Sequence, residues 1–532
     1  MKPDTQATPE HSPLAQRFQA LAQQQGSHIA LHFRQDQALW TCDFAKFWRR
    51  VERVTAHLQS DWQIQAGDRV AWLGLNHELQ LVALVACARI GAVFMPLNYR
   101  LAVAELQQVL ADATPALLVH DSLHHPVAPS LNGPGLRRTH QDALINAPAP
   151  RGLSLPAVTG DAPVLLVYTS GTTGQPKGAL HTQDNLMANA RASQAAHGFV
   201  PSDQVLSTLP LFHVGGLCIQ TLPALLAGVT VILHARFDAQ AWLDEVESSR
   251  PSLSLLVPAT LRAVIDHPHW PLAQLSSLRG LMTGSSTIPA AYLQAFHDRG
   301  IPVGQIYGTT ETGPVSIVLP FDQAVARMGS TGWPQSEAQL ALRNEQGQSV
   351  AVGQTGEVCI RAPNVMRGYW QADGRGGVGL QAAGRDGAGR GSAGRDGVGL
   401  QAGWFATGDL GQQAPDGCVT IVGRSKDMII SGGENIYPAE IENLLVTLPG
   451  VLECAVVGMP DARWGEVPVA VIVRSADAPG QALTPEGVLQ HLQNRIARFK
   501  LPRRVVWLET LPKSALGKVQ KPALQAQLQA LL

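Results

Sequence analysis

The sequence lacks the features that mark several specialised protein classes. It has only six cysteines in 532 residues, and none of them forms a CxxC pair. This scarcity argues against a zinc site or a disulfide framework and is typical of a reducing compartment such as the cytoplasm. The formal net charge is -1 and the pI is near 7.0, so a nucleic-acid partner has no electrostatic support.

Long uninterrupted apolar runs are missing as well. The N-terminal residues are polar and contain no apolar region of the kind found in secretory signals. The most apolar stretch, residues 79–97, is interrupted by Arg89 and Gly91 and contains Pro96 near its end. We expect a buried helix followed by a strand there, and no integral membrane association.

The residues that are present predict layered α/β structure. In the first 335 residues, short β-rich runs alternate with amphipathic stretches, which favours mostly parallel sheets. Gly/Ser/Thr turns follow several of these strands, at the edge where such sheets bind ligands. At this length two or more domains are expected. We predict a large N-terminal domain over residues 1–425 and a small α+β domain over residues 426–532.

One segment, at about residues 373–402, is rich in glycine and repetitive. The sequence GVGLQA occurs at residues 377–382 and again at 397–402. A segment with almost no large apolar side chains cannot bury a core. We interpret it as a surface insertion rather than a functional module.

The stretch YTSGTTGQPKG, residues 168–178, has the composition of a phosphate-binding loop. Small residues let backbone N–H groups approach phosphate oxygens, and the lysine adds positive charge. The P-loop pattern fails, because Lys177 lies between Pro176 and Gly178. Taken alone, the stretch is better explained as a flexible surface turn.

Three further residues occur in turns suited to the same chemistry. Glu311 follows a predicted strand and is a candidate Mg²⁺ ligand beside a triphosphate, although a solvated turn carboxylate is the ordinary alternative. Asp409 lies in a glycine-flanked turn suited to ribose hydroxyls, or it belongs to a simple β-turn. Lys518 follows Gly517 near the C-terminus, where lysines are usually solvated.

Taken together and in this order, the motifs resemble those of the adenylate-forming superfamily of acyl-CoA synthetases, luciferases and nonribosomal-peptide adenylation domains. The motifs are YTSGTTGQPKG, YGTTE, TGDLG, GRSKDMIISGGENIYP and PKSALGKVQK. The resemblance runs from about residue 15 to the C-terminus and is interrupted only by the insertion. It implies layered α/β sheets plus a β-barrel-like subdomain in the N-terminal domain, and a mobile C-terminal domain. It also implies ATP, Mg²⁺ and coenzyme A.

The resemblance assigns a role to each matching residue. Catalytic roles fall on Lys518, Thr310, Glu311 and His213, and the Mg²⁺ ligands are Thr169 and Glu311. The phosphates are assigned to Thr169, Ser170, Gly171, Thr172, Thr173, Gly174 and Lys177. The rest of the nucleotide is assigned to Gly284, Ser285, Ser286, Tyr307, Gly308, Thr309, Thr310, Asp409 and Arg424, with Thr310 near the α-phosphate. Lys426 matches the hinge, and Gly432, Gly433, Glu434 and Trp464 belong to the coenzyme A side.

The implied function is the ATP-dependent conversion of a fatty or aromatic acid to an acyl-adenylate and then to an acyl-CoA thioester. His213 resembles a gating residue, and Gly215 and Gly216 favour a bulky or elongated acyl group. Loading of a carrier protein and o-succinylbenzoate–CoA ligation are the alternatives. A luciferase-like monooxygenase and a non-catalytic scaffold are disfavoured. The sequence leaves a homodimer open, as well as whether the insertion slows domain closure.

Overall fold

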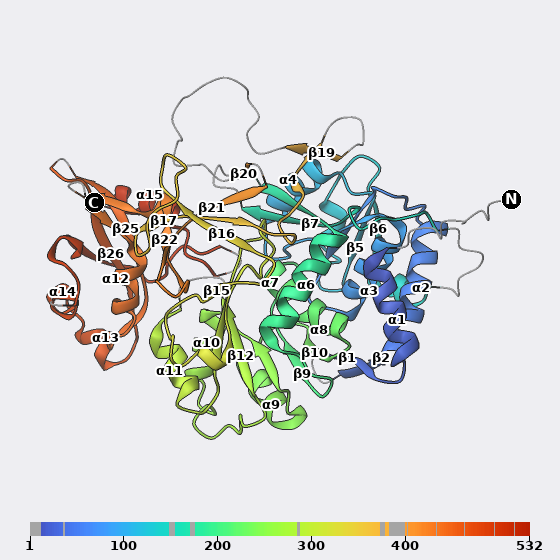
Figure 1. Ribbon diagram of the computed structural model, residues 1–532, viewed down its shortest axis with the longest axis horizontal. Helices are drawn as coiled ribbons and strands as arrows, with labels where there is room; N and C mark the ends of the chain where they lie inside the picture. The colour runs from blue at the N-terminus through green and yellow to red at the C-terminus, as the bar shows by residue number, and fades with distance from the viewer. Residues whose placement is uncertain are drawn as a thin grey trace.

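The computed structural model describes most of the chain. The described residues are 12–35, 38–147, 155–170, 176–284, 288–372, 378–381, 399–401, 403–431, 434–461, 463–493, 495–514 and 517–531. Their strands form four sheets, of nine, eight, five and five strands. The mixed α/β architecture with a large N-terminal domain and a C-terminal domain agrees with the sequence-based prediction (Figure 1).

The eight-stranded sheet carries the predicted phosphate loop. Its order is β19-β18-β8-β7-β4-β3-β5-β6. The bounds are β3 (Arg69–Leu73), β4 (Val93–Pro96), β5 (Leu117–His120), β6 (Arg137–His140), β7 (Pro163–Ser170), β8 (Pro176–Thr182) and β18 (Gly368–Ala372). Strands β3 to β7 pair in parallel, whereas β8 and β18 run antiparallel to their neighbours. Helix α3 (Glu78–Ile90) precedes β4 and is closed by Gly91 in a left-handed conformation, as the sequence predicted.

The nine-stranded sheet follows the order β15-β14-β13-β12-β11-β9-β10-β1-β2. Its strands are β1 (Ile29–Gln35), β2 (Ala38–Asp43), β9 (Gln204–Ser207), β10 (Thr230–His234), β11 (Leu253–Leu255), β12 (Gly280–Gly284), β13 (Val303–Tyr307), β14 (Ile317–Leu319) and β15 (Trp333–Pro334). Helices lie between the two large sheets. The largest core cluster combines Leu84 of α3 and Ala190 of α6 (Gln183–His197) with Val70 of one sheet and Val231 of the other.

A smaller antiparallel sheet stands where the β-barrel-like subdomain was expected. It consists of β16 (Gln339–Arg343), β17 (Thr355–Arg361), β20 (Gly399–Gln401), β21 (Trp404–Gln413) and β22 (Val419–Arg424). Two pieces of the predicted insertion form edge strands. Strand β19 (Val378–Gln381) pairs with β18, and β20 pairs with β21. Residues 373–377, 382–398 and 402 of the insertion lie outside the described residues.

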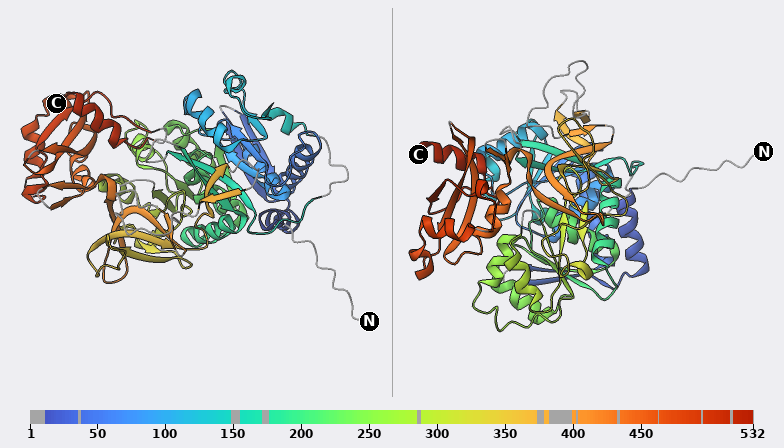
Figure 2. Two further views of the ribbon diagram at one scale, coloured as in Figure 1. Left: turned by 90° about the horizontal axis from the view of Figure 1, so that it is seen from above. Right: turned by 60° about the vertical axis from the view of Figure 1, so that its left-hand side comes forward.

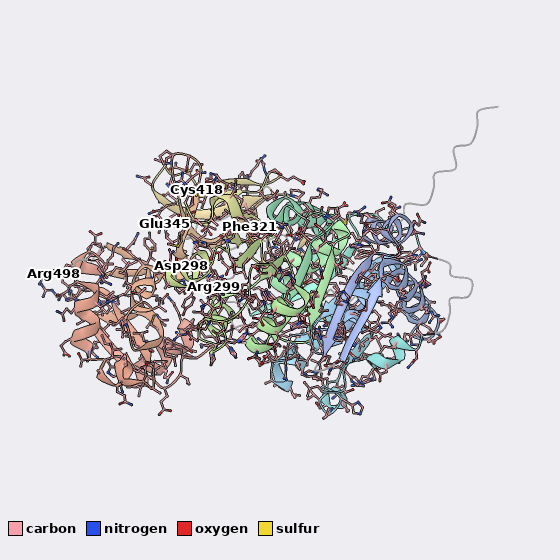
Figure 3. The ribbon with its side chains drawn as sticks, turned by 90° about the horizontal axis from the view of Figure 1, so that it is seen from below. Asp298, Arg299, Phe321, Glu345, Cys418 and Arg498 are labelled. Carbon is pink, nitrogen blue, oxygen red and sulfur yellow. The ribbon has the colours of Figure 1, made fainter. Side chains whose placement is uncertain are left out.

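The fourth sheet belongs to the C-terminal part of the chain, drawn in orange to red in Figure 2. Its strands are β23 (Ile429–Ser431), β24 (Glu434–Ile436), β25 (Val451–Asp461), β26 (Gly465–Arg474) and β27 (Arg504–Trp507). Helices α12 (Pro438–Leu445) and α15 (Lys521–Leu531) contribute to two apolar clusters of this part alone. Figure 3 places Arg498 on this part, apart from Glu345 and Cys418 beside the smaller antiparallel sheet. The division at 425/426 stays a prediction.

Within the described residues, no helix is long and apolar enough to cross a membrane. The apolar stretch at residues 79–97 instead forms buried α3 and β4, whose side chains pack in the core.

Candidate active site

The predicted phosphate loop connects two strands that pair with each other, β7 and β8, which we call the phosphate hairpin. Strands β7 and β8 pair antiparallel, with Thr169 opposite Lys177, and Thr169 Oγ1 donates to the Lys177 carbonyl at 3.3 Å. This topology differs from a P-loop, which joins a strand to a helix. The predicted phosphate ligands Gly171, Thr172, Thr173 and Gly174 lie outside the described residues, as does the side chain of Ser170.

The loop over residues 308–316, which we call the Glu311 loop, follows β13 on the nine-stranded sheet. Its own threonines fix its shape: the Thr309 backbone N–H donates to Thr312 Oγ1 at 2.9 Å, and the Thr312 N–H donates to Thr309 Oγ1 at 3.2 Å. The Glu311 carbonyl accepts from the Met366 N–H at 2.7 Å. The loop is therefore held before any ligand binds, which suits a residue that must present a carboxylate at a defined place.

Tyr369 links the Glu311 loop to the phosphate hairpin. Its hydroxyl donates to Glu311 Oε1 at 2.8 Å, and the Lys177 ammonium lies 5.6 Å from its ring centroid. Burial and the neighbouring Glu311 carboxylate raise the pKa of Tyr369, so its hydroxyl stays a donor. Sequence reasoning missed Tyr369, because an aromatic residue in the strand sequence GYWQA is indistinguishable from a core side chain.

A second group joins the predicted adenine and ribose residues. Tyr307 donates to Asp409 Oδ2 at 2.8 Å, and Arg424 Nε lies 3.0 Å from Asp409 Oδ1. Asp409 on β21 is register partner to Arg424 on β22, which explains why residues 15 positions apart meet. Burial and the Asp409 charge raise the pKa of Tyr307, and Asp409 raises the pKa of Arg424. The two residues assigned to ribose therefore form one ion pair.

Lys518 reaches this group from the C-terminal part of the chain. The residue stays accessible to solvent, yet desolvation by the surrounding protein lowers the pKa of its ammonium to about 8. Repulsion from Arg424 adds to the effect, while attraction to Asp409 and Glu311 opposes it. The charges of three residues of the N-terminal domain thus act on Lys518, and its catalytic role stays a prediction.

His213 lies near Lys518 and is neutral at neutral pH. Burial, with a smaller contribution from the Lys518 charge, lowers the pKa of His213 to about 4. Its Nδ1 accepts from the Gly215 N–H at 3.0 Å. A neutral imidazole that accepts at Nδ1 carries its proton on Nε2. His213 therefore has an N–H donor available at the start of the helix that follows.

That helix, residues 214–227, we call the acyl helix. It consists of α7 (Val214–Gly216), a π-helical segment (Leu217–Thr221) and α8 (Leu222–Ala227). The two glycines of this helix, Gly215 and Gly216, are needed for different reasons. A Cβ at Gly216 would lie 2.2 Å from the Pro210 carbonyl oxygen, so packing alone requires this glycine. A Cβ at Gly215 would meet only the His213 ring, at 2.9 Å from Nδ1. Of the two glycines, only Gly215 can still be explained by the need to admit a bulky or elongated acyl group.

The remaining predicted residues have varied positions. Gly284 ends β12, where a Cβ would lie 2.3 Å from the Ile306 carbonyl oxygen of the neighbouring strand. Gly308 and Thr310 lie in the Glu311 loop, and Thr310 is buried. Lys426, Glu434 and Trp464 belong to the C-terminal sheet and its connecting turn. The sequence-predicted Ser285, Ser286, Gly432 and Gly433 lie outside the described residues.

The few protein oxygens near the predicted phosphate loop are compatible with a magnesium ion whose other ligands are phosphate oxygens and water. In the described part of the chain, no group of three or more His, Cys, Asp or Glu side chains is arranged to hold a metal ion. Mg²⁺ commonly takes one or two carboxylates and completes its shell with phosphate oxygens and water. A single carboxylate at Glu311, with the hydroxyl of Thr169 on the phosphate hairpin, is compatible with that coordination.

Comparison with known proteins gives consistent matches over nearly the whole chain. Residues 18–370 match the family described as AMP-binding enzyme, and residues 440–518 match the AMP-binding enzyme C-terminal domain. The indoleacetate–CoA ligase of Aromatoleum aromaticum is 44% identical, covering 88% of this chain and 90% of that one. A feruloyl-CoA synthase of Amycolatopsis is 40% identical, with 90% and 92% covered.

A more distant relative is the long-chain-fatty-acid–CoA ligase FadD13 of Mycobacterium tuberculosis, 32% identical, with 88% and 89% covered. Among solved structures, ATP-bound MatB from Rhodopseudomonas palustris superposes with a TM-score of 0.84 at 29% identity, covering 97% of this chain and 99% of that one.

Proposed function

The chain belongs to the family of AMP-binding enzymes, and we propose that it joins an aromatic acid to coenzyme A at the expense of ATP. The proposed acids are arylacetates and arylpropenoates, because the relatives named for indoleacetate and ferulate are more similar in sequence than the one named for long-chain fatty acids. One observation carries the proposal. Lys518 of the C-terminal part lies close enough to Glu311, Asp409 and Arg424 of the N-terminal domain for their charges to act on its ammonium.

In the first half-reaction the acid's carboxylate attacks the α-phosphorus of ATP. A bond forms between the carboxylate oxygen and phosphorus, and the bond to pyrophosphate breaks. The Lys518 ammonium donates to the oxygens where negative charge accumulates. Stabilisation of this kind is commonly worth about 3 kcal/mol for one donor. The phosphate hairpin, with Thr169 and Lys177, holds the leaving pyrophosphate.

Glu311 and Thr169 would hold a magnesium ion, which supplies charge neutralisation for the phosphate oxygens. Asp409 accepts from the ribose hydroxyls, while Tyr307 and Arg424 keep its carboxylate in place. We place the aromatic acid beside the acyl helix, near Gly215 and the Nε2–H of His213. A neutral His213 suits an apolar acyl group, because no charge has to be desolvated.

In the second half-reaction the thiolate of coenzyme A attacks the carbonyl carbon, and AMP leaves as its bond to the acyl group breaks. We assign Gly432, Gly433, Glu434 and Trp464 to this step, with Lys426 as the hinge about which residues 426–532 reorient. Six free cysteines, with no disulfide among them, support a cytoplasmic location.

The test is pyrophosphate release measured over a panel of carboxylic acids, with and without coenzyme A. We expect indole-3-acetate or ferulate to exceed decanoate in kcat/KM, and an acyl-CoA to form only when coenzyme A is present. A higher kcat/KM for decanoate would contradict the proposed aromatic substrates and favour fatty acids instead. Acyl transfer to a carrier protein but not to coenzyme A would favour the carrier-loading alternative.

A further inference from the structure

Helix α6 carries a row of polar side chains on its buried face. Asn185, Asn189 and Ser193 recur at intervals of four residues, which places them on one side of the helix. Asn189 is only 2% exposed and Ser193 is 0% exposed. Buried polar groups are costly unless hydrogen bonds satisfy them, so a row of them needs partners that a hydrophobic core does not offer.

Part of the row satisfies the π-helical segment of the acyl helix. A π turn leaves backbone carbonyls out of step with the regular α-helical ladder, and such turns are frequent at functional sites. Asn189 Nδ2 donates to the Cys218 carbonyl at 2.6 Å, and Ser193 Oγ donates to the Ile219 carbonyl. Thr221 Oγ1 donates to the Gly216 carbonyl at 2.6 Å. The irregular turn is therefore held by side chains placed for it.

Asn189 alone in this row also bonds the Glu311 loop. Its Oδ1 accepts from the Val315 N–H at 3.3 Å, four residues after Glu311. On the other side, Asn364 Nδ2 donates to the Val315 carbonyl at 3.1 Å. The N–H and the carbonyl of Val315 are thus both hydrogen-bonded to buried asparagines. One of the two, Asn189, is also hydrogen-bonded to the acyl helix.

The space around Asn189 makes this link direct. Asn189 lines a narrow void together with His181, Val214, Cys218, Gly313 and Asn364, and this void is too small for a water molecule. Water therefore cannot bridge the acyl helix and the Glu311 loop at this point. The amide of Asn189 is planar, so a movement that follows the Cys218 carbonyl also moves the oxygen bonded to Val315.

We propose that Asn189 is a positioning residue that couples acid binding at the acyl helix to ATP binding at the Glu311 loop. The inference rests on the proposed function, because it takes the acyl helix as the acid site and Thr310 and Glu311 as nucleotide ligands. Acid that displaces or orders the acyl helix changes the position of Val315 through Asn189. By linkage, each substrate then raises the affinity for the other by the same factor.

The experiment compares the affinity for a non-hydrolysable ATP analogue with and without saturating acid, using the acid that gives the fastest pyrophosphate release. In the wild type we expect the acid to tighten analogue binding about fivefold or more, the lower end of typical coupling. Asn189→Leu, which keeps a similar volume, should reduce this factor to about one. The matched control is Ser193→Ala, which removes a bond to the same π-helical segment, whereas within the described residues Ser193 forms no hydrogen bond with the Glu311 loop. It should keep the wild-type factor.

A coupling factor near one in the wild type, or a wild-type factor in Asn189→Leu, would overturn the inference. Should Asn189→Leu fail to fold, amide hydrogen exchange in the wild type gives the answer. Acid alone should slow exchange in the peptide covering residues 308–316, and unchanged exchange there would equally overturn it. These failures differ from failure of the proposed function, in which no acid of the panel supports pyrophosphate release by the wild type.

Discussion

Tyr369 donates a hydrogen bond to Glu311, with 2.8 Å between the phenol oxygen and Oε1. The two residues come from different sheets, Tyr369 from β18 of the eight-stranded sheet and Glu311 from the loop after β13. Because the Lys177 ammonium also lies over the Tyr369 ring, one side chain touches both the proposed metal ligand and the proposed phosphate ligand. Tyr369 therefore connects two parts of the proposed ATP site.

Tyr369→Phe should raise the Mg²⁺ concentration that the first half-reaction requires. A hydrogen bond to a carboxylate contributes about 1.5–3 kcal/mol, so we expect KM for MgATP to rise about tenfold or more. KM for the acid should change little. The measurement is pyrophosphate release against Mg²⁺ concentration at fixed ATP. Trp370→Phe is the matched control, because Trp370 is the next residue of the strand and donates to the Asp112 carbonyl instead. An unchanged Mg²⁺ profile in Tyr369→Phe would contradict the assignment.

The pKa of Lys518 predicts how adenylation depends on pH. The ammonium has a pKa of about 8, lowered from its ordinary value, so its charge is present below pH 8 and is lost as the pH rises through that value. The kcat/KM for acyl-adenylate formation, which reports the free enzyme, should fall on the alkaline side. Lys518→Arg should remove this alkaline limb, because arginine stays protonated. An identical limb in both enzymes would assign the titration to another group.

Lys518→Ala separates the two half-reactions. We expect pyrophosphate release to fall about 100-fold or more, as for loss of one donor to developing charge. Conversion of supplied acyl-adenylate to acyl-CoA should continue, because Lys518 has no proposed part in that step. The comparison uses the same protein preparation in both assays. Equal losses in the two assays would remove the proposed role of Lys518.

Sequence could predict the residues that carry a local signature. Lys177, Glu311, Asp409 and Lys518 each occur in a short motif of glycines, hydroxyls or charges, and the structure groups Lys518 with the two carboxylates. The strand before the phosphate loop and the buried helix α3 were likewise readable from hydrophobic patterning.

Residues whose roles depend on partners far away in the sequence had no such local signature. Tyr369 and Glu311 are 58 positions apart, and Asn189 and Val315 are 126 positions apart. A tyrosine in an apolar strand and an asparagine in a helix both look ordinary, because their roles depend on which strand or loop packs beside them. The packing need for Gly216 was hidden for the same reason, since it arises from the Pro210 carbonyl.

The two glycines of the acyl helix should respond differently to the same substitution. Gly216→Ala places a Cβ 2.2 Å from backbone, and overpacking of this kind costs about 1–3 kcal/mol, so thermal unfolding should shift downward. Gly215→Ala should cost less stability, because its Cβ meets only the His213 side chain, and it should alter the kcat/KM ratio between ferulate and a smaller acid such as benzoate. The pair of melting curves and the acid panel check both statements. A stable Gly216→Ala enzyme with altered selectivity would reverse the assignment of the two glycines.

Arg262 joins the two parts of the chain in this conformation. It lies on α10 (Pro258–Ile265) of the N-terminal domain, forms an ion pair with Asp266 at 2.9 Å, and donates from Nη1 to the Leu452 carbonyl of β25. In this same conformation Lys518 comes under the influence of the Glu311, Asp409 and Arg424 charges. We therefore expect a bond that favours this conformation to favour adenylation over the thioester step.

Arg262→Ala should therefore slow pyrophosphate release without slowing conversion of supplied acyl-adenylate. A partly exposed hydrogen bond contributes about 1 kcal/mol, which corresponds to an effect of about fivefold on the first half-reaction. Asp266→Ala is the control, because it removes the ion pair but leaves Arg262 and its bond to Leu452. We expect a smaller change there. If Arg262→Ala slows both half-reactions equally, the bond supports the fold of the domain rather than the orientation that adenylation requires, since only an effect on orientation divides the two steps.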